Sequence, residues 1–498
     1  IFFAVMVGVG FYSRRHVKSV DGFVLGGRSV GPWLTAFAYG TSYFSAVVFV
    51  GYAGQFGWKY GIASTWIGIG NALIGSLLAW VVLGRRTKVM TQHLRAKTMP
   101  DFFGQRYGSK ALKIVASVIV FVFLIPYTAS VYNGLSRLFG MAFNIPYTWC
   151  VIAMAVFTAI YVILGGYMAT AINDFIQGII MLFGIVAVIA SVLNGQGGFM
   201  EAVSKMAQIP SDVPATMGQP GAFTSFFGPD PLNLLGVVIL TSLGTWGLPQ
   251  MIGKFYAIKD EKSINTGTVI STLFAIVISG GCYFLGGFGR LFDSAEIYNA
   301  ETGAVVYDSI IPSMLSKLPD ILIGIVVVLV LSASMSTLSS LVLTSSSTMT
   351  LDLLKDNIMK EMSEKKQIIT MQILIVFFIV VSVVIALDPP TFIAQLMGIS
   401  WGALAGAFLA PFLYGLYWKG VTRAGVWAGF IAGVGITVSN MFIGYIASPI
   451  NAGAAAMVAG LVIVPLVSLV TPKLKKEDVD EIFTCYEEKV VSTKKRNL

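Results

Sequence analysis

The strongest constraint on the fold is a succession of apolar segments, each close to the length that crosses a bilayer. Only 11% of the residues are charged, against about 25% in a soluble domain. About 20 apolar residues cross the hydrocarbon core as a helix. The sequence therefore predicts an all-α integral membrane protein with about thirteen transmembrane helices, at residues 1–12, 31–54, 62–84, 112–140, 146–164, 171–193, 231–255, 265–289, 313–350, 367–387, 391–417, 422–447 and 450–471.

Lys and Arg fall mainly in alternate loops of this layout. All but five of the 33 lie in one set of loops and in the tail, the exceptions being Lys59, Arg137, Lys205, Arg290 and Lys317. Positively charged loops remain in the cytoplasm. We therefore predict a multi-pass protein of the cell membrane with its N-terminus outside and its C-terminus in the cytoplasm. The net charge of +9 reflects this bias, and no nucleic-acid partner is predicted. The chain begins inside an apolar run without Met, so we expect further residues before Ile1.

Few side chains are available for metal or covalent chemistry. Three cysteines show no pairing or metal-binding pattern, and the only histidines, His16 and His93, lie in basic loops. A membrane enzyme would need His, Cys or paired carboxylates within its spans, and this layout places only Asp174 there. We therefore predict that the protein is not an enzyme.

One predicted span carries many hydroxyl groups in its second half. Residues 331–350 read LSASMSTLSSLVLTSSSTMT and contain no charge. Ser336, Thr337 and Ser340 share a helix face with Ala333, because residues three, four and seven apart lie on one side. Neutral oxygens gathered on one face suit a small hard cation. The alternative is that these hydroxyls bond to their own helix carbonyls and allow close packing.

Two other spans are interrupted near their centres. The second span contains residues 40–43 (GTSY), and the seventh contains residues 244–249 (GTWGLP). Pro249 lacks an amide donor and clashes with the preceding turn. Interrupted spans in both halves of a chain are typical of transporters in which two broken helices meet at a midplane site. The alternative is a pair of kinks whose free backbone groups are satisfied by neighbouring helices.

Polar side chains near these spans are candidates for ion or solute binding. Asp174 begins the predicted sixth span; an intramembrane carboxylate is functional by default, but it could equally cap the helix that starts there. No span near the breaks is expected to carry Lys or Arg, because Lys254 is assigned to a cytoplasmic loop. An acidic solute would then be held by helix N-termini, hydroxyls and a bound cation. The candidates for a central solute cavity are Ser42, Tyr43, Ser45, Tyr127, Trp246, Gln250 and Trp401.

Several longer motifs resemble those of the sodium:solute symporter family. They are residues 21–32, 165–167, 173–178, 333–339 and 418–425, and the resemblance covers nearly the whole chain. It implies a leucine-transporter-type fold, with five helices, an inverted repeat of five and flanking helices. The expected segments are a truncated first helix and loop at 1–30, the first repeat at 31–193, an extracellular loop at 194–230, the second repeat at 231–417, two additional helices at 418–471 and a cytoplasmic tail at 472–498.

The resemblance also implies Na+ as the coupled ion and names residues that would bind it. Members similar to the sialate transporter have a second sodium site, whose ligands would correspond to Asp174, Ser339 and Ser340; whether that site fills is left open. The first site would use three carbonyl oxygens and two hydroxyls, from Thr41, Phe44, Ala333, Ser336 and Thr337.

Departures from the family pattern narrow the expected solute. Tyr43 stands where proline-transporting members have Asp, Val48 where sugar-transporting members have Gln, and Tyr127 where the sialate transporter has its carboxylate-binding Arg. These differences argue against proline, sugars and sialate. Tyr43, Ser45 and Ala46 are similar to the pantothenate branch, which points to a small organic acid or zwitterion.

The predicted function is sodium-coupled import of a small organic solute, an organic acid or amino acid, by alternating access. We expect the protein to act as a monomer in the lipid bilayer. The alternative is an ion channel, or a transport-type sensor without coupled solute uptake. A channel would not need broken helices in both halves, and the tail is too short for a signalling domain.

Overall fold

The computed structural model describes residues 2–388 and 392–487. Residues 1, 389–391 and 488–498 lie outside this description, and with them parts of the predicted segments 1–30, 231–417 and 472–498. Within the described ranges the chain is almost entirely helical and forms no extended strand. The predicted all-α class is confirmed.

Ten helical stretches in the described part are long and apolar enough to cross a bilayer, and two of them are double length. Val47–His93 has 47 residues and Tyr147–Gly195 has 49, about 70 Å at 1.5 Å per residue and more than twice the hydrocarbon thickness. Each therefore crosses twice. In the described part of the chain these stretches make twelve crossings, and α1 (Phe2–Ser13) adds one more. The helix α3 (Pro32–Tyr43) begins the span that residues 47–60 complete, so the total agrees with the thirteen predicted spans.

The reversals inside the two long stretches are visible in the backbone and in its contacts. The first stretch turns at Gly61–Ser64. The second is α9 (Tyr147–Gly195), in which Gly166 has φ 53° and ψ −145°. Phe3 of α1 stacks on Phe157 before this turn, and the carbonyl of Met6 accepts a hydrogen bond from Asn173 after it. Both arms of α9 thus run beside α1, so the chain reverses at Gly166.

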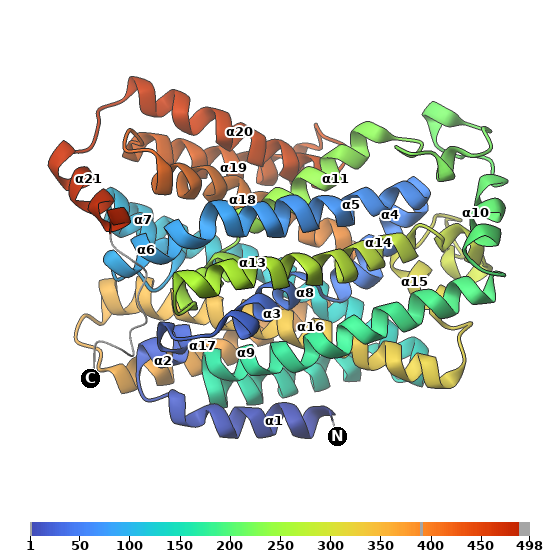
Figure 1. Ribbon diagram of the computed structural model, residues 1–498, viewed down its shortest axis with the longest axis horizontal. Coiled ribbons are helices and arrows are strands. Elements are labelled where there is room, and N and C mark those ends of the chain that lie inside the picture. The colour runs from blue at the N-terminus through green and yellow to red at the C-terminus, as the bar shows by residue number, and fades with distance from the viewer. Residues whose placement is uncertain (1, 389–391, 488–498) are drawn as a thin grey trace.

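The helices lie side by side in one bundle (Figure 1). Within it, α16 packs against α3, α8, α9 and α17, while α19 and α20 pack against each other and against α18. Several spanning stretches are built from more than one helix. Besides α1, α3 and α9, the helices that make up these stretches are α4 (Ala53–Tyr60), α5 (Thr65–Gly70) continuing to α6 (Arg85–His93), α8 (Lys110–Phe143), α11 (Pro231–Leu243), α12 (Pro249–Ala257), α13 (Glu261–Ala275), α14 (Gly281–Gly286), α16 (Asp320–Thr348), α17 (Glu364–Leu387), α18 (Ile393–Tyr417), α19 (Arg423–Ile443) and α20 (Pro449–Val470).

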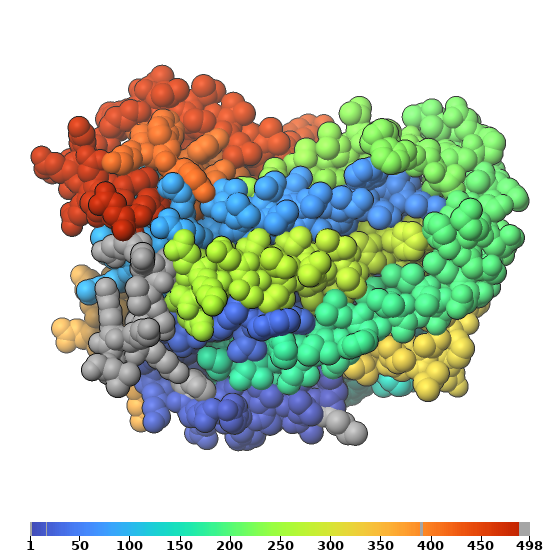
Figure 2. Space-filling model, viewed as in Figure 1, coloured from blue at the N-terminus to red at the C-terminus, as the bar shows by residue number. Residues whose placement is uncertain are grey.

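The loops rich in Lys and Arg gather at one end of the bundle. Figure 1 shows α2 (Val20–Leu25), α6, α7 (Met99–Tyr107) and α21 (Lys476–Phe483) together at the left. The opposite end carries α10 (Phe199–Ala207) and α15 (Ile310–Leu315), and Figure 2 shows the green segment around α10 covering it. We call these the basic end and the α10 end.

The break in the second span lies slightly later than predicted. The helix α3 continues through Gly40 to Tyr43, Phe44 is extended with φ −94° and ψ 117°, and helical turns resume at Val47. Gly40 is small because Phe274 packs against it: an added Cβ would lie 2.4 Å from that ring. The prediction that residues 40–43 form the interruption is therefore wrong by a few residues, because that glycine permits close packing instead of breaking the helix.

The break in the seventh span lies where the sequence predicts it. The helix α11 ends at Leu243, a single 3-10 turn spans Gly244–Trp246, and α12 begins at Pro249 after the extended residue Leu248. The fixed φ of proline and its missing amide hydrogen suit the first position of a helix. Pro249 thus starts the second half-helix, and the prediction is confirmed.

Glycines allow α4 and α14 to approach backbone to backbone. A Cβ at Gly57 would lie 1.9 Å from the carbonyl oxygen of Gly286, and one at Gly286 would lie 2.1 Å from that of Ala53. We expect Gly57→Ala or Gly286→Ala to destabilise the protein by about 1–3 kcal/mol. The measurement is the melting temperature of purified protein in detergent. Gly435→Ala is the matched control, because nothing lies within 4 Å of a Cβ there; equal melting temperatures for all three variants would contradict this account.

Candidate functional site

The hydroxyl face of α16 lies directly against the break in α3. Ser336 Oγ is 2.8 Å from the carbonyl oxygen of Thr41 and 3.0 Å from that of Ala333. Thr337 Oγ1 is 3.2 Å from the Thr41 carbonyl, 3.4 Å from the Phe44 carbonyl and 3.1 Å from the Ala333 carbonyl. The structure therefore brings together all five predicted ligands of the first sodium site. All five residues are buried: Phe44 is 3% exposed, and the other four are at most 2% exposed.

This cluster exists because the break frees backbone oxygens. The last four carbonyls of a helix lack partners within that helix, and Thr41 belongs to the last turn of α3. A cation with oxygens at about 2.4 Å, the range for Ca²⁺, separates neighbouring oxygens of an octahedral shell by about 3.4 Å. The observed spacings of 2.8–3.4 Å need only slight expansion to reach that geometry.

Other hydroxyls of α16 bond to carbonyls of their own helix, as the alternative interpretation of this span predicts. Ser339 Oγ donates to the carbonyl of Ser336 at 2.8 Å, Ser346 to that of Leu343, and Ser347 to that of Thr344. These bonds stay within the helix, and they let a polar helix sit in a tightly packed interior. Local bonding and cation-ready geometry therefore coexist on different turns of the same helix.

The residues of the predicted second site surround a lysine. Asp174 lies inside α9, eight residues after the turn at Gly166, so it does not cap the helix. Both of its carboxylate oxygens are buried without a hydrogen-bond partner among the described residues. The Nζ of Lys254 lies 4.0 Å from Asp174 Oδ2 and donates to Ser340 Oγ at 3.0 Å.

Two sequence predictions fail at this point. The sequence predicts Lys254 in a cytoplasmic loop and no Lys or Arg near the breaks, yet the side chain of Lys254 is 4% exposed inside the bundle. It belongs to α12, the second half of the broken seventh span. A lysine near the end of a span counts as a loop residue by position, although its depth depends on how the helix tilts and packs.

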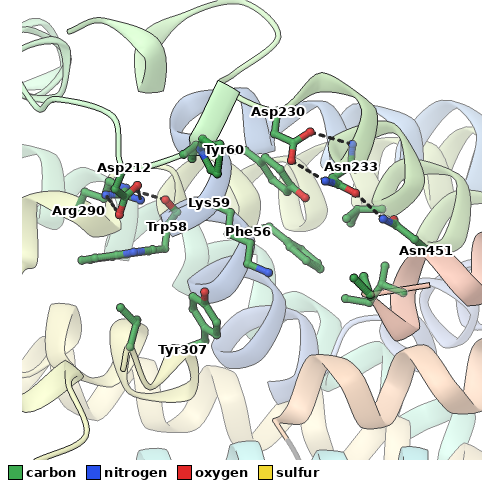
Figure 3. Close-up of a pocket in the computed structure, with 17 residues that line it drawn as sticks. Phe56, Trp58, Lys59, Tyr60, Asp212, Asp230, Asn233, Arg290, Tyr307 and Asn451 are labelled. Atoms are coloured by element: carbon green, nitrogen blue, oxygen red, sulfur yellow. Dashed lines mark hydrogen bonds and ion pairs between the residues drawn. The ribbon is translucent and has the colours of Figure 1, made fainter. Parts of the chain in front are cut away.

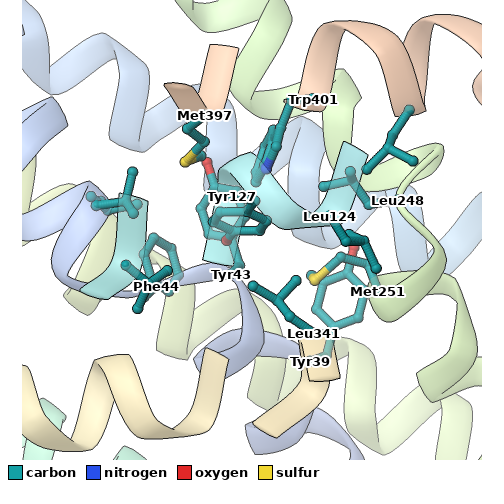
Figure 4. Close-up of a cluster of buried hydrophobic side chains, with 14 of the residues drawn as sticks. Tyr39, Tyr43, Phe44, Leu124, Tyr127, Leu248, Met251, Leu341, Met397 and Trp401 are labelled. Atoms are coloured by element: carbon teal, nitrogen blue, oxygen red, sulfur yellow. The ribbon is translucent and has the colours of Figure 1, made fainter. Parts of the chain in front are cut away.

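The aromatic candidates from three helices meet between the breaks (Figure 4). The ring of Trp401 lies 5.4 Å from that of Tyr43 and 5.9 Å from that of Tyr127, between centroids. The Tyr43 hydroxyl donates to the carbonyl of Thr241, just before the second break, at 3.1 Å. Tyr43 thus joins the two broken spans.

The two serines of the first broken span face different partners. Ser42 Oγ lies 2.7 Å from Ser340 Oγ, so Ser42 faces α16 and the lysine. Ser45 Oγ accepts from the amide of Val47 at 3.1 Å, and its carbonyl accepts from the amides of the following turn. Ser45 therefore starts the second half-helix.

The two candidates on the seventh span also diverge. Trp246 Nε1 donates to the carbonyl of Ile74 at 2.9 Å, so its indole turns toward the third span. Gln250 is 2% exposed, and its amide has no hydrogen-bond partner in the described part of the chain. It lies one turn before Lys254 and lines the same small cavity. Gln250 is thus the polar group of this span that is free to bind a ligand.

A large cavity opens at the α10 end (Figure 3). Its volume is about 600 Å³, within the range of small-molecule pockets. Arg290 pairs with Asp212 at 2.7 Å on one side, and Asp230 accepts from Asn233 on the other. Lys59 lies between them, with its Nζ 5.1 Å from the centre of the Tyr307 ring.

A much smaller cavity faces the basic end. Its volume is about 40 Å³, close to the roughly 30 Å³ that one water occupies in the liquid. Gln250, Lys254, Ser340 and Tyr167 are among the residues that line it. The cavity beside Lys254 is therefore much smaller than the one at the α10 end.

Comparison with known proteins identifies the family. The model of the sodium:solute symporter family matches residues 23–433. A sodium/proline symporter of Staphylococcus aureus (strain JH9) is 30% identical over 496 residues, covering 96% of this chain and 92% of the relative; the protein of strain Mu3 / ATCC 700698 matches equally. The chain belongs to the sodium:solute symporter family. The family and these relatives are transporters, which agrees with the predicted function of this chain as a sodium-coupled solute symporter.

Solved structures confirm the leucine-transporter-type fold. A substrate-bound, outward-open Na+-coupled sialic acid symporter superposes with a TM-score of 0.74 at 14% identity, covering 95% of this chain and 97% of that one. Mhp1, a nucleobase-cation-symport-1 family transporter in a closed conformation with bromovinylhydantoin bound, gives 0.53 at 13% identity, covering 93% and 98%.

The five converging oxygens predict sodium-dependent stability. A ligand at 100 times its Kd stabilises the folded state by about 2.7 kcal/mol. We expect Na+, but not K+, to raise the melting temperature of the purified protein, and the double variant Ser336→Ala and Thr337→Ala to lose that increase. Ser345→Ala with Ser346→Ala is the matched control on the same helix, because Ser346 bonds only to its own helix. A sodium effect that survives in the first variant would disprove this binding site.

Proposed function

We propose that this protein imports a small organic acid or amino acid together with Na+ by alternating access. The observation that carries the proposal is the convergence of the Thr41, Phe44 and Ala333 carbonyls with the hydroxyls of Ser336 and Thr337 at 2.8–3.4 Å. These oxygens come from two separate elements, so a cation between them fixes how α3 sits against α16. An ion bound within one helix would have no such effect.

Sodium binding would shift the conformational equilibrium through this contact. Without the ion, the two hydroxyls donate to the three carbonyls; with it, all five oxygens turn their lone pairs to the cation. A ligand shifts an equilibrium only by its differential affinity, and the full set of five exists only when the break in α3 lies on α16. Sodium thus favours that arrangement, and a membrane potential adds about 2.3 kcal/mol per ion per 100 mV.

The solute site lies between the two breaks, at Tyr43, Tyr127 and Trp401. Half-helices begin nearby at Val47 and Pro249, and helix N-termini attract anionic groups. A carboxylate would face these N-termini, while the aromatic rings cover the apolar part of the molecule. Gln250 supplies a free amide toward the basic end. This combination favours a small zwitterion or organic acid.

The direction of transport follows from the two cavities and from the charge bias. We assign the basic end to the cytoplasm, because Lys- and Arg-rich loops remain there, and the α10 end to the outside. The cavity of about 600 Å³ is then the entry vestibule for solute. Its Arg290 is already paired with Asp212, which leaves Lys59 as the cation available to an incoming carboxylate.

Uptake into proteoliposomes tests the proposal. With an inward Na+ gradient, we expect saturable accumulation of one compound from a panel of amino acids and organic acids, and loss of at least 90% of it in the Ser336→Ala and Thr337→Ala double variant. Proline belongs in the panel, because the relatives are sodium/proline symporters although Tyr43 argues against it. Monensin, which collapses the gradient, is the control. Flux that neither saturates nor depends on Na+ would favour the channel alternative.

A further inference from the structure

An ammonium group stands among the residues expected to hold a second sodium ion. Lys254 Nζ lies 3.0 Å from Ser340 Oγ and 4.0 Å from Asp174 Oδ2. It also lies 5.2 Å from the centre of the Tyr167 ring, a distance typical of a cation over an aromatic face. The side chains of Lys254 and Asp174 are 4% and 0% exposed. The lysine of α12 is therefore an internal partner of Asp174, and its ammonium is held between α9 and α16.

The charges around this point balance without an added ion. The helices around this contact are α3, α9, α12 and α16; α3 carries no charged residue, and α16 carries none between Asp320 and its end. Lys97, which also lines the small cavity, is paired with Asp21 of α2 at 2.9 Å. Asp174 on α9 and Lys254 on α12 are the two charged side chains in the contact. A sodium ion beside them would leave one uncompensated positive charge away from water, which is costly.

One oxygen of the expected second site is already engaged by the ammonium. Ser340 Oγ accepts from Lys254 and lies 2.7 Å from Ser42 Oγ. Ser339 Oγ donates to the carbonyl of Ser336 at 2.8 Å. Both Ser339 and Asp174 keep lone pairs for a cation, but the small cavity beside the lysine has room for about one water. A sodium ion would have to displace the ammonium to gather three ligands.

We propose that Lys254 takes the place of a second sodium ion and that the protein binds one Na+ per molecule. The ammonium supplies the positive charge that Asp174 needs, and Ser340 connects it to Ser42 on α3, next to the first site. This inference rests on the proposed function, because it takes the oxygens of Thr41, Phe44, Ala333, Ser336 and Thr337 as the sodium site that remains.

Equilibrium binding of ²²Na+ to the purified full chain in nanodiscs measures the number of ions directly. We expect one ion per wild-type protein with a Hill slope near one. Two ions per wild-type protein would overturn the proposal, and this result needs no variant to fold. If the wild type binds no ion, or if Ser336→Ala with Thr337→Ala leaves binding intact, the proposed sodium site itself is wrong, which is a separate failure.

Variants at Lys254 test the substitution of ammonium for sodium. We expect Lys254→Met to bind two ions, with a Hill slope above one, because Asp174 and Ser340 are released. Lys254→Arg keeps the positive charge and should bind one ion. The double variant Lys254→Met with Asp174→Asn should also bind one, because the attracting carboxylate is gone. A Lys254→Met protein that elutes as a single species, retains the first ion and gains none would overturn the proposal.

Discussion

The structure depends on one constraint: in hydrocarbon, each backbone polar group needs a partner from within the protein. At the break after α3, the carbonyls of Thr41 and Phe44 have no hydrogen-bond partner within the helix. The hydroxyls of Ser336 and Thr337 on α16 donate hydrogen bonds to these carbonyls. These hydroxyls allow two arrangements, since a hydroxyl can either donate to a carbonyl or turn its oxygen to a cation.

The third span shows the same principle from the other side. Its π-helical turns at Asn71–Leu78 leave carbonyls that are free to accept from other helices. Gly75 accepts from Tyr39 at 2.8 Å and from Thr245 at 3.0 Å, and these residues come from the two broken spans. The irregular backbone of one helix thus accepts hydrogen bonds from a regular turn of α3 and from the break after α11. This explains why Trp246 turns toward Ile74 and away from the space between the breaks.

Features encoded locally were predictable from the sequence, and features set by packing were not. Apolar length gave the spans, Pro249 gave the second break, and the spacing of Ser336 and Thr337 placed their hydroxyls on one face. The prediction of a break at Gly40 failed because a glycine in a span can serve close packing as well as a break. The close contact of Gly40 with Phe274 is visible only in the packed structure. Asp174 resembles a helix cap in the sequence because the predicted sixth span starts at residue 171, whereas α9 is helical from directly after Gly166. The depth of Lys254 follows from how α12 packs, which no local signal records.

The two cavities and the lysine together define what must move for the basic end to open. The small cavity lies between α2, residues 97–99, α12 and α16, with Tyr167 of α9 beside them, and Lys254 and Ser340 form part of its wall. If α12 moves away from α9 or α16, a contact of the buried ammonium breaks. Because Ser340 also touches Ser42, the same motion disturbs the helix whose break forms the cation cluster. The packing of α12 and the position of the break in α3 are therefore linked by one short chain of polar contacts, from Asp174 and Lys254 through Ser340 to Ser42.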